Sequence, residues 1–150
     1  MKSLTLLIAG IALAAVSLSA QARETAQEKA NIRTVEALYN AALNDKDFVK
    51  ARAYIGDRYI QHNPTARDGI EGLHAFIDFL RAKFPASHSE IKQAFADGNF
   101  VILHVHSVRV PGTLGRAIVD IFRLQNGKVV EHWDVVQDIP EHPANSNTMF

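Results

Sequence analysis

The sequence contains no cysteine, no excess of charge of either sign, and no apolar run long enough to predict a confident membrane span. Without cysteine, the chain has neither disulfides nor thiol chemistry. Lysine and arginine together number 16, as do aspartate and glutamate, and no basic stripe is present. These features argue against nucleic acid as a partner. The chain also lacks internal repeats, low-complexity tracts and linkers, so we expect one folded domain.

The first 22 residues have the pattern of a secretory signal peptide. Lys2 precedes an apolar run over residues 4–16, and the small-x-small pattern Ala20-Gln21-Ala22 follows. The alternative is an uncleaved anchor, but the run is short for a membrane span. We therefore expect residues 1–22 to be removed and residues 23–150 to form a periplasmic or secreted domain with no membrane attachment.

Apolar periodicity divides the remaining chain into a helical half and a strand half. Apolar residues at helical spacing predict three helices, over about 32–42, 48–55 and 68–84. A loop or short strand with the turn Asn63-Pro64 separates the last two helices. From residue 88 the period changes to two, which predicts four strands, over about 88–96, 100–110, 116–125 and 128–137. This order predicts an α+β fold with helices packed on one face of an antiparallel sheet.

Two Asx-Gly pairs predict tight hairpin turns and, through them, the register of the sheet. Asp97-Gly98 joins the first strand pair and Asn126-Gly127 joins the last. The last turn sets Asp120 opposite Trp133, and a symmetric middle loop sets Asp120 opposite His106. One sheet face then carries Ile91, Phe95, Phe100, Ile102, His104, His106, Ile118, Asp120, Phe122, Glu131 and Trp133.

The opposite face of the expected sheet mixes apolar and charged side chains. It carries Val101, Leu103, Val119 and Ile121 beside Arg109, His132 and Asp134. A face this apolar is unfavourable in water, so the first four residues are expected to form the interface of a homodimer.

Asp120 is the residue that this register makes chemically unusual. A carboxylate between Ile118 and Phe122 on an apolar face requires a partner, and His106 would supply one. Burial raises the pKa of an aspartate and a nearby imidazolium lowers it, so such a pair is suited to proton transfer near neutral pH. The alternative is a hydrogen-bonded pair with a purely structural role.

Longer motifs give the chain a resemblance to a known family. The order of helices and strands, "YIQHNP" in the loop and "VDIFRLQNGKVVEHWDVVQDIP" at the end resemble the SnoaL-like polyketide cyclases of the nuclear transport factor 2-like, or cystatin-like, superfamily. The chain is most similar to predicted SnoaL-like aldol-condensation enzymes, whose ends resemble "NTMF". The resemblance implies a cone in which three N-terminal helices close a pocket on a curved antiparallel sheet.

The same resemblance implies roles for two residues. In the family an aspartate acts as acid or base, aided by a histidine one strand earlier and without metal or cofactor, and Asp120 and His106 match these positions. From its place in the loop, we expect His62 to serve as a second catalytic donor at the pocket mouth. The residues expected to bind substrate are His104, Trp133, Phe122, Tyr59 and Ile102.

The expected function is cofactor-free acid–base chemistry, an aldol cyclisation or an enolisation, on a small apolar carbonyl compound. Export is unusual for a protein of polyketide assembly. We therefore expect this chain to share the fold and the pocket of the family more readily than its substrate. Two alternatives remain open. The first is a non-catalytic protein that binds a small ligand in the same pocket. The second is a metal site, because His104 and His106 with a third ligand such as His62 or Asp120 have suitable spacing.

Overall fold

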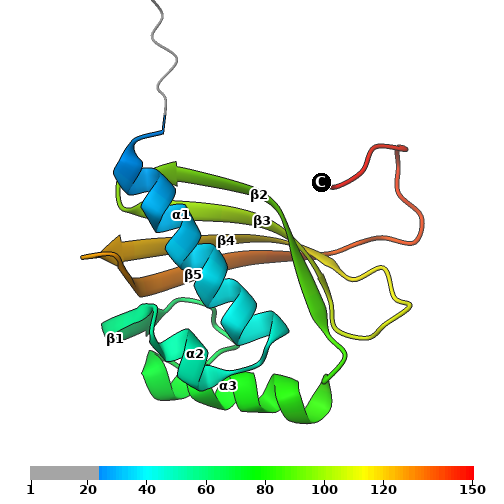
Figure 1. Ribbon diagram of the computed structural model, residues 1–150. Coiled ribbons are helices and arrows are strands. Elements are labelled where there is room, and N and C mark those ends of the chain that lie inside the picture. Colours follow the sequence, from blue (N-terminus) through cyan, green and yellow to red (C-terminus); the bar gives the residue numbers. More distant parts are fainter. Residues whose placement is uncertain (1–23) are drawn as a thin grey trace, which may run out of the picture.

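The computed structural model describes residues 24–150, so the expected signal peptide lies outside the described residues. Helices cover one face of a five-stranded sheet with the strand order β1-β5-β4-β3-β2 (Figure 1). The elements are α1 (Ala26–Tyr39), its π-helical continuation η1 (Asn40–Asn44), α2 (Phe48–Arg52), β1 (Ile55–Gln61), α3 (Gly69–Lys83), β2 (His88–Asp97), β3 (Phe100–Val108), β4 (Arg116–Gln125) and β5 (Lys128–Asp138). Within residues 24–150, no helix has the length and apolar character needed to cross a membrane.

The α+β architecture predicted from periodicity is confirmed, but the sheet is mixed rather than purely antiparallel. Strand β1 pairs in parallel with β5 at one edge, where the sequence predicted a loop or a short strand. Only Ile55 and Tyr59 of this strand are buried. Asp57, midway between them, is exposed, so no period-two alternation of apolar residues marks β1 in the sequence, and its pairing with the last strand defines it.

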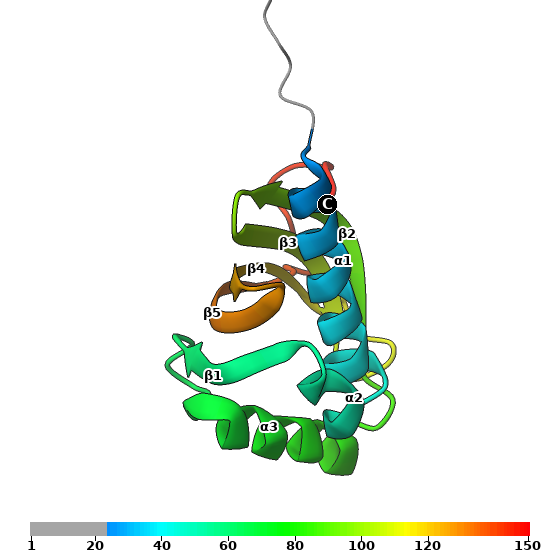
Figure 2. The same ribbon diagram turned by 60° about the vertical axis from the view of Figure 1, so that its left-hand side comes forward.

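The helices form a layer over the sheet and close one end of it. Helix α1 lies across the face of β2, β3 and β4, and α3 lies beyond the edge strand β1 (Figures 1 and 2). A capping box between Thr25 and Glu28 begins α1, and Asp68 caps α3 at the position that the sequence predicted. The core between the layers includes Val35, Leu38, Tyr39, Ile77, Val101, Leu103 and Val105.

The β2–β3 turn lies one residue later than predicted. Asp97 pairs with Phe100, so the turn is Gly98-Asn99. Helix α1 holds this turn, since Glu28 accepts the Gly98 N–H at 2.9 Å and Asn31 donates to the Gly98 carbonyl oxygen at 3.0 Å. Contacts with a helix distant in sequence therefore stabilise the observed turn over the predicted one.

The pairing of β3 with β4 differs from the prediction by an odd number of residues. His106 lies opposite Ala117, and Asp120 lies opposite Leu103 rather than His106. Because side chains alternate along a strand, an odd shift turns every side chain of β3 to the other face. His104 and His106 therefore face away from the helices. The residues of β3 that pack in the core instead are Val101, Leu103 and Val105.

The two faces of strand β5 are also exchanged relative to the prediction. The Asn126-Gly127 turn itself is confirmed, but the register shifts just beyond it, so that Asp120 pairs with Asp134 instead of Trp133. His132 shares the face of Asp134 and lies toward the helices, whereas Trp133 lies on the opposite face. An irregularity of this kind inserts one residue into a strand and leaves no clear mark in the sequence.

The described helices leave the outer face of the sheet uncovered (Figure 2). This face is partly apolar. Its exposed large residues include Phe95, Phe100, Ile102, Val119 and Val135. Two of the four residues predicted for the dimer surface, Val101 and Leu103, do not lie on this face, because both are 0% exposed in the core. Val119 and Ile121 do lie on the outer face, opposite His104 and Ile102 respectively.

Candidate active site

A cavity of about 480 Å³ lies between the helices and the inner face of the sheet. Its walls come from α1, η1, α3, the end of β1, residues 63–67 and the inner faces of β2, β3, β4 and β5. The apolar part of the wall is formed by Leu38, Leu73, Phe76, Leu80, Ile118, Phe122 and Val136. A cavity of this size and lining is typical of sites that bind small organic molecules.

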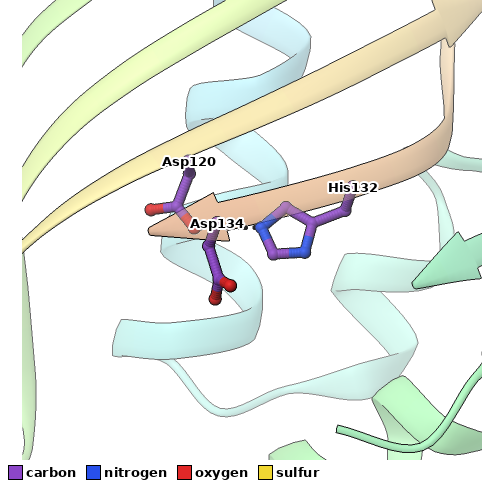
Figure 3. A group of neighbouring side chains, drawn as sticks. All are labelled: Asp120, His132 and Asp134. Carbon is purple, nitrogen blue, oxygen red and sulfur yellow. Dashed lines mark hydrogen bonds and ion pairs between the residues drawn. The ribbon is translucent and has the colours of Figure 1, made fainter. Parts of the chain in front are cut away.

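Asp120 lies in the middle of the inner face, with 4% of the residue exposed. His132 Nε2 is 2.9 Å from its Oδ1, and the Tyr39 hydroxyl donates to its Oδ2 at 3.1 Å. Figure 3 shows the imidazole of His132 directed at Asp120, with the carboxylate of Asp134 beside them. Both oxygens of the buried carboxylate therefore have a partner, one from β5 and one from α1.

The second nitrogen of His132 shows how many protons this pair holds. Nδ1 is 3.0 Å from Oε1 of Gln61, and the same oxygen accepts the backbone N–H of Asn63 at 2.9 Å. The Asn63 contact sets the orientation of the amide, so Nδ1 carries a hydrogen and donates it to Gln61. A neutral imidazole would then direct a lone pair at Asp120. The 2.9 Å contact therefore requires one more proton, shared between His132 Nε2 and Asp120 Oδ1.

The surroundings of Asp120 oppose one another in their effect on its pKa. Burial raises the pKa of Asp120 above its ordinary value, while the hydrogen bond and charge of His132 lower it. Burial raises the pKa of Tyr39 well above its ordinary value, and the charge of Asp120 adds to the rise, so this phenol remains a donor. A buried carboxylate with a raised pKa and an adjacent imidazole is suited to accepting and returning a proton.

Tyr59 presents a second phenol to the cavity. Its ring is nearly parallel to that of His132, with 6.4 Å between the ring centroids. Its hydroxyl oxygen accepts a hydrogen bond from Gln61 Nε2 at 3.4 Å, and none of the described residues accepts its hydrogen. Burial raises the pKa of Tyr59, so the hydroxyl stays protonated and can donate to an oxygen atom of a ligand.

Asp134 completes a group of side chains that could hold a metal ion. One ligand atom from each of Asp120, His132 and Asp134 lies within 4.8 Å of the others, and two carboxylates with an imidazole form a donor set for a divalent cation. All three side chains already have protein partners, however. Asn63 Nδ2 donates to both oxygens of Asp134, at 2.8 and 2.7 Å, and Tyr39 donates to Asp120. The group is therefore satisfied by hydrogen bonds alone.

The structure brings some of the predicted site residues together and separates the others. Asp120, Phe122 and Tyr59 line the cavity. The remaining strand residues lie on the outer face, because the registers of β3 and β5 differ from the prediction: His106, His104, Ile102 and Trp133. The predicted pairing of Asp120 with His106 is therefore wrong.

The two outward histidines have other contacts. His106 Nε2 is 2.8 Å from the Leu114 carbonyl oxygen, which holds the loop between β3 and β4. The ring of Phe150 packs against both, with centroids 5.2 Å from His104 and 4.9 Å from His106. Among residues 24–150, neither histidine belongs to a group of three potential metal ligands, so the structure does not bring together the ligands of the alternative His-x-His metal site.

His62 lies at the rim of the cavity, with its side chain directed to the outside. Its imidazole stacks on Trp133, with 4.5 Å between centroids, and its Nε2 is 2.9 Å from Glu131 Oε1. Its neighbours Gln61 and Asn63 line the cavity, whereas His62 does not. The structure therefore does not bring His62 to Asp120, as its expected role requires.

Sequence reasoning missed His132, Tyr39, Gln61 and Asn63 as members of the site. A signal for one of them is present in "EHWD", because His132 and Asp134 must share a face and alternate with Glu131 and Trp133. Only the pairing of β5 decides which pair faces the cavity. For Tyr39, no local signal separates a site residue from an ordinary core residue of an amphipathic helix.

Solved structures with the same arrangement define the class of fold. An uncharacterized cystatin-fold protein from Novosphingobium aromaticivorans is 24% identical over 70% of this chain and 97% of its own, with a TM-score of 0.61. A protein named as a candidate SnoaL-like polyketide cyclase, from Jannaschia sp. CCS1, is 21% identical over 77% and 90%, with a TM-score of 0.63. An NTF2-like protein of unknown function from Cytophaga hutchinsonii is 18% identical over 71% and 89%, with a TM-score of 0.59. The chain has the cystatin-like, nuclear transport factor 2-like fold.

The family is defined more narrowly by the sequence. Residues 35–132 match the model of the SnoaL-like domain, a match that spans more than half of the chain and includes both Asp120 and His132. The chain therefore belongs to the SnoaL-like domain family. No curated protein matches the chain.

Proposed function

We propose that the protein binds a small, largely apolar carbonyl compound in the cavity and moves a proton on it without a cofactor, in an enolisation or an aldol cyclisation. The observation that carries this proposal is the 2.9 Å contact of His132 Nε2 with Asp120 Oδ1 at the wall of a mostly apolar cavity. Acid–base catalysis requires a group that can take a proton from carbon and return it, held next to the bound substrate.

The proposed step uses only groups of this chain. Asp120, with the shared proton on His132, accepts a proton from the carbon beside the ligand carbonyl. The C–H electron pair forms the double bond of an enolate, and the carbonyl pair moves to oxygen, where the Tyr59 hydroxyl donates a hydrogen bond. Return of the proton from Asp120 to oxygen or to another carbon completes an enolisation.

An aldol cyclisation uses the same enolate. Its carbon attacks a second carbonyl of the ligand, a C–C bond forms, and the proton on Asp120 passes to the new alkoxide. In both reactions His132 keeps the other proton and orients the carboxylate. His132 thereby takes the role that the sequence assigned to His106.

Exchange of carbon-bound hydrogen for deuterium tests this proposal without knowledge of the natural substrate. The protein is incubated with 1-tetralone in D2O, and proton NMR follows both binding of the ketone and loss of its α-hydrogen signal. Asp120→Asn keeps the shape of the side chain but cannot accept the proton, so we expect the exchange rate to fall about 10²- to 10⁴-fold. Asp57→Asn, at an exposed position of β1, is the matched control and should exchange at the wild-type rate. A ketone that binds but exchanges no faster than in buffer would favour the non-catalytic binding protein.

We also propose that the protein acts in the periplasm or outside the cell, on the basis of the N-terminal pattern. Mass spectrometry of the protein from the periplasmic fraction should find Arg23 as its first residue. Protein that begins with Met1 and is extracted only with membranes would contradict export.

A further inference from the structure

The cavity has a second polar end, away from Asp120. Arg109 follows β3, Arg116 begins β4, and both line the cavity together with Ser89 and Ser107. Arg116 and Asp120 lie on the same face of β4, and the rise per residue of a strand places their Cα atoms about 13 Å apart. The apolar wall lies between the acidic end and this basic end.

Arg109 has no anionic partner. Among residues 24–150, no carboxylate lies within ion-pair distance of its guanidinium group, and its only close aromatic neighbours in the structure are Phe76 and Phe84. Its guanidinium carbon is 5.9 and 5.6 Å from the centroids of these two rings. Burial lowers the pKa of Arg109, and the charge of Arg116 lowers it further. A partly buried cation beside a like charge is unfavourable, and a bound anion would offset that cost.

Arg116 and Ser107 have hydrogen-bond donors that are not used within the described part of the chain. Arg116 Nε is 3.2 Å from Oδ1 of Asp138, whose side chain is 84% exposed. In the described part of the chain, the two terminal amino groups of Arg116 have no acceptor. Ser89 Oγ donates to Ser107 Oγ at 3.0 Å, which leaves the Ser107 hydrogen available to a ligand.

We infer that this end of the cavity binds an oxyanion of the ligand. The ligand class is then an apolar carbonyl compound that carries one carboxylate or similar oxyanion at the end remote from the carbonyl group. Arg109, which has no acidic partner, and the two terminal amino groups of Arg116, which have no acceptor in the described part of the chain, supply donors for such an anion at the cavity wall. The carboxylates of Asp120 and Asp134 at the other end disfavour the reverse orientation. This inference deepens the proposed function and rests on it only in requiring that a ligand occupies the cavity.

Two fluorescent probes that differ in one group test the inference directly. 1-Anilinonaphthalene-8-sulfonate and N-phenyl-1-naphthylamine share a ring system, but only the first carries an anion. In fluorescence titrations we expect the sulfonate to bind the protein at least about tenfold more tightly than the neutral probe. Arg109→Gln should weaken sulfonate binding about tenfold or more and change binding of the neutral probe less than about twofold. Arg58→Gln, at an exposed position outside the cavity, is the charge-matched control and should change neither.

A second variant locates the bound probe. Ile118→Trp fills the cavity between its two ends and should weaken both probes, and circular dichroism checks that each variant is folded. Equal affinity of the two probes in the wild type, or equal loss of both in Arg109→Gln, would overturn the anion site while leaving the cavity intact. If neither probe binds saturably, or if Ile118→Trp leaves binding unchanged, the cavity is not the binding site and the proposed function fails with it.

Discussion

His132 Nε2 lies 2.9 Å from Asp120 Oδ1 across the pair of strands β4 and β5, while Nδ1 of the same ring lies 3.0 Å from Gln61. Gln61 accepts the hydrogen of Nδ1, so the contact with Asp120 contains a proton that either partner can hold. The position of that proton is sensitive to every group around the pair, including a bound ligand.

We expect His132→Gln to shift the pH dependence of hydrogen exchange to higher pH. The hydrogen bond and charge of His132 lower the pKa of Asp120, and burial raises it. When the imidazole is removed, burial is less opposed and the pKa of Asp120 rises. Asp120 then stays protonated to a higher pH, so the low-pH limb of the rate profile moves upward in pH. Exchange rates of 1-tetralone across the pH range measure this shift.

The control for this variant is on the other face of the sheet. His106→Gln changes a histidine that contacts the Leu114 carbonyl oxygen instead of the cavity, so it should keep the wild-type profile. His132→Gln keeps a hydrogen-bond donor beside Asp120, so the expected rise in the pKa of Asp120 comes from loss of the imidazole charge. An equal shift in both variants would show that His132 has no special role.

We expect wild-type protein to lose stability relative to Asp120→Asn as the pH rises above about 4. The folded-state pKa of Asp120 is raised by burial above the ordinary value of 3.8 that applies in the unfolded chain. In the interval between these two pKa values the unfolded chain releases the proton first, so the free energy of unfolding falls as the pH rises. Each unit of pKa difference corresponds to about 1.4 kcal/mol.

Urea denaturation of both proteins between about pH 4 and 6 measures this effect before histidines in the unfolded chain titrate. The asparagine variant has no carboxyl group at this position, so the difference between the two curves isolates Asp120. We expect the variant to fold, because neutralising a buried carboxylate removes a desolvation cost along with a partner. A difference in free energy of unfolding that is constant with pH would contradict the raised pKa.

We expect a homodimer that forms through the outer face of the sheet. Val119 is 39% exposed on that face, so Val119→Lys should give monomers in sedimentation velocity experiments without unfolding the chain. Leu103 is 0% exposed in the core, so Leu103→Ala should instead cost about 2–5 kcal/mol of stability and leave association intact. Wild-type protein that remains monomeric at high concentration would contradict the dimer.

We expect the protein to function without a bound metal ion. A cation between Asp120, His132 and Asp134 would displace the shared proton and compete with the Asn63 amide for Asp134. Elemental analysis of protein purified without a His-tag should therefore find no stoichiometric zinc, iron, copper, nickel or manganese. One equivalent of metal in the wild-type protein that is lost in His132→Gln would contradict this prediction and would indicate metal-assisted chemistry at this site.

The elements of the fold were predictable because they depend on short-range patterns. The apolar stripe of Leu73, Ile77 and Leu80 and the stop at Pro85 predicted α3 to within a residue at each end. Alternation predicted the four antiparallel strands, and Asn126-Gly127 predicted the last turn. Asp120 could also be identified, because an aspartate that alternates with Ile118 and Phe122 shares their face whatever the strand pairs with.

The partners of Asp120 were decided by tertiary structure. A period of two tells which residues of one strand share a face, but not which face meets the helices or how neighbouring strands align. One odd shift at β3 and one irregularity at β5 therefore exchanged His106 for His132. Tyr39, 81 residues from Asp120 in sequence, reaches it only because α1 packs across the sheet. The local pattern of apolar residues determines the helices and strands. The burial of whole faces against one another determines which side chains meet, because the free energy of that burial depends on all the packed residues at once.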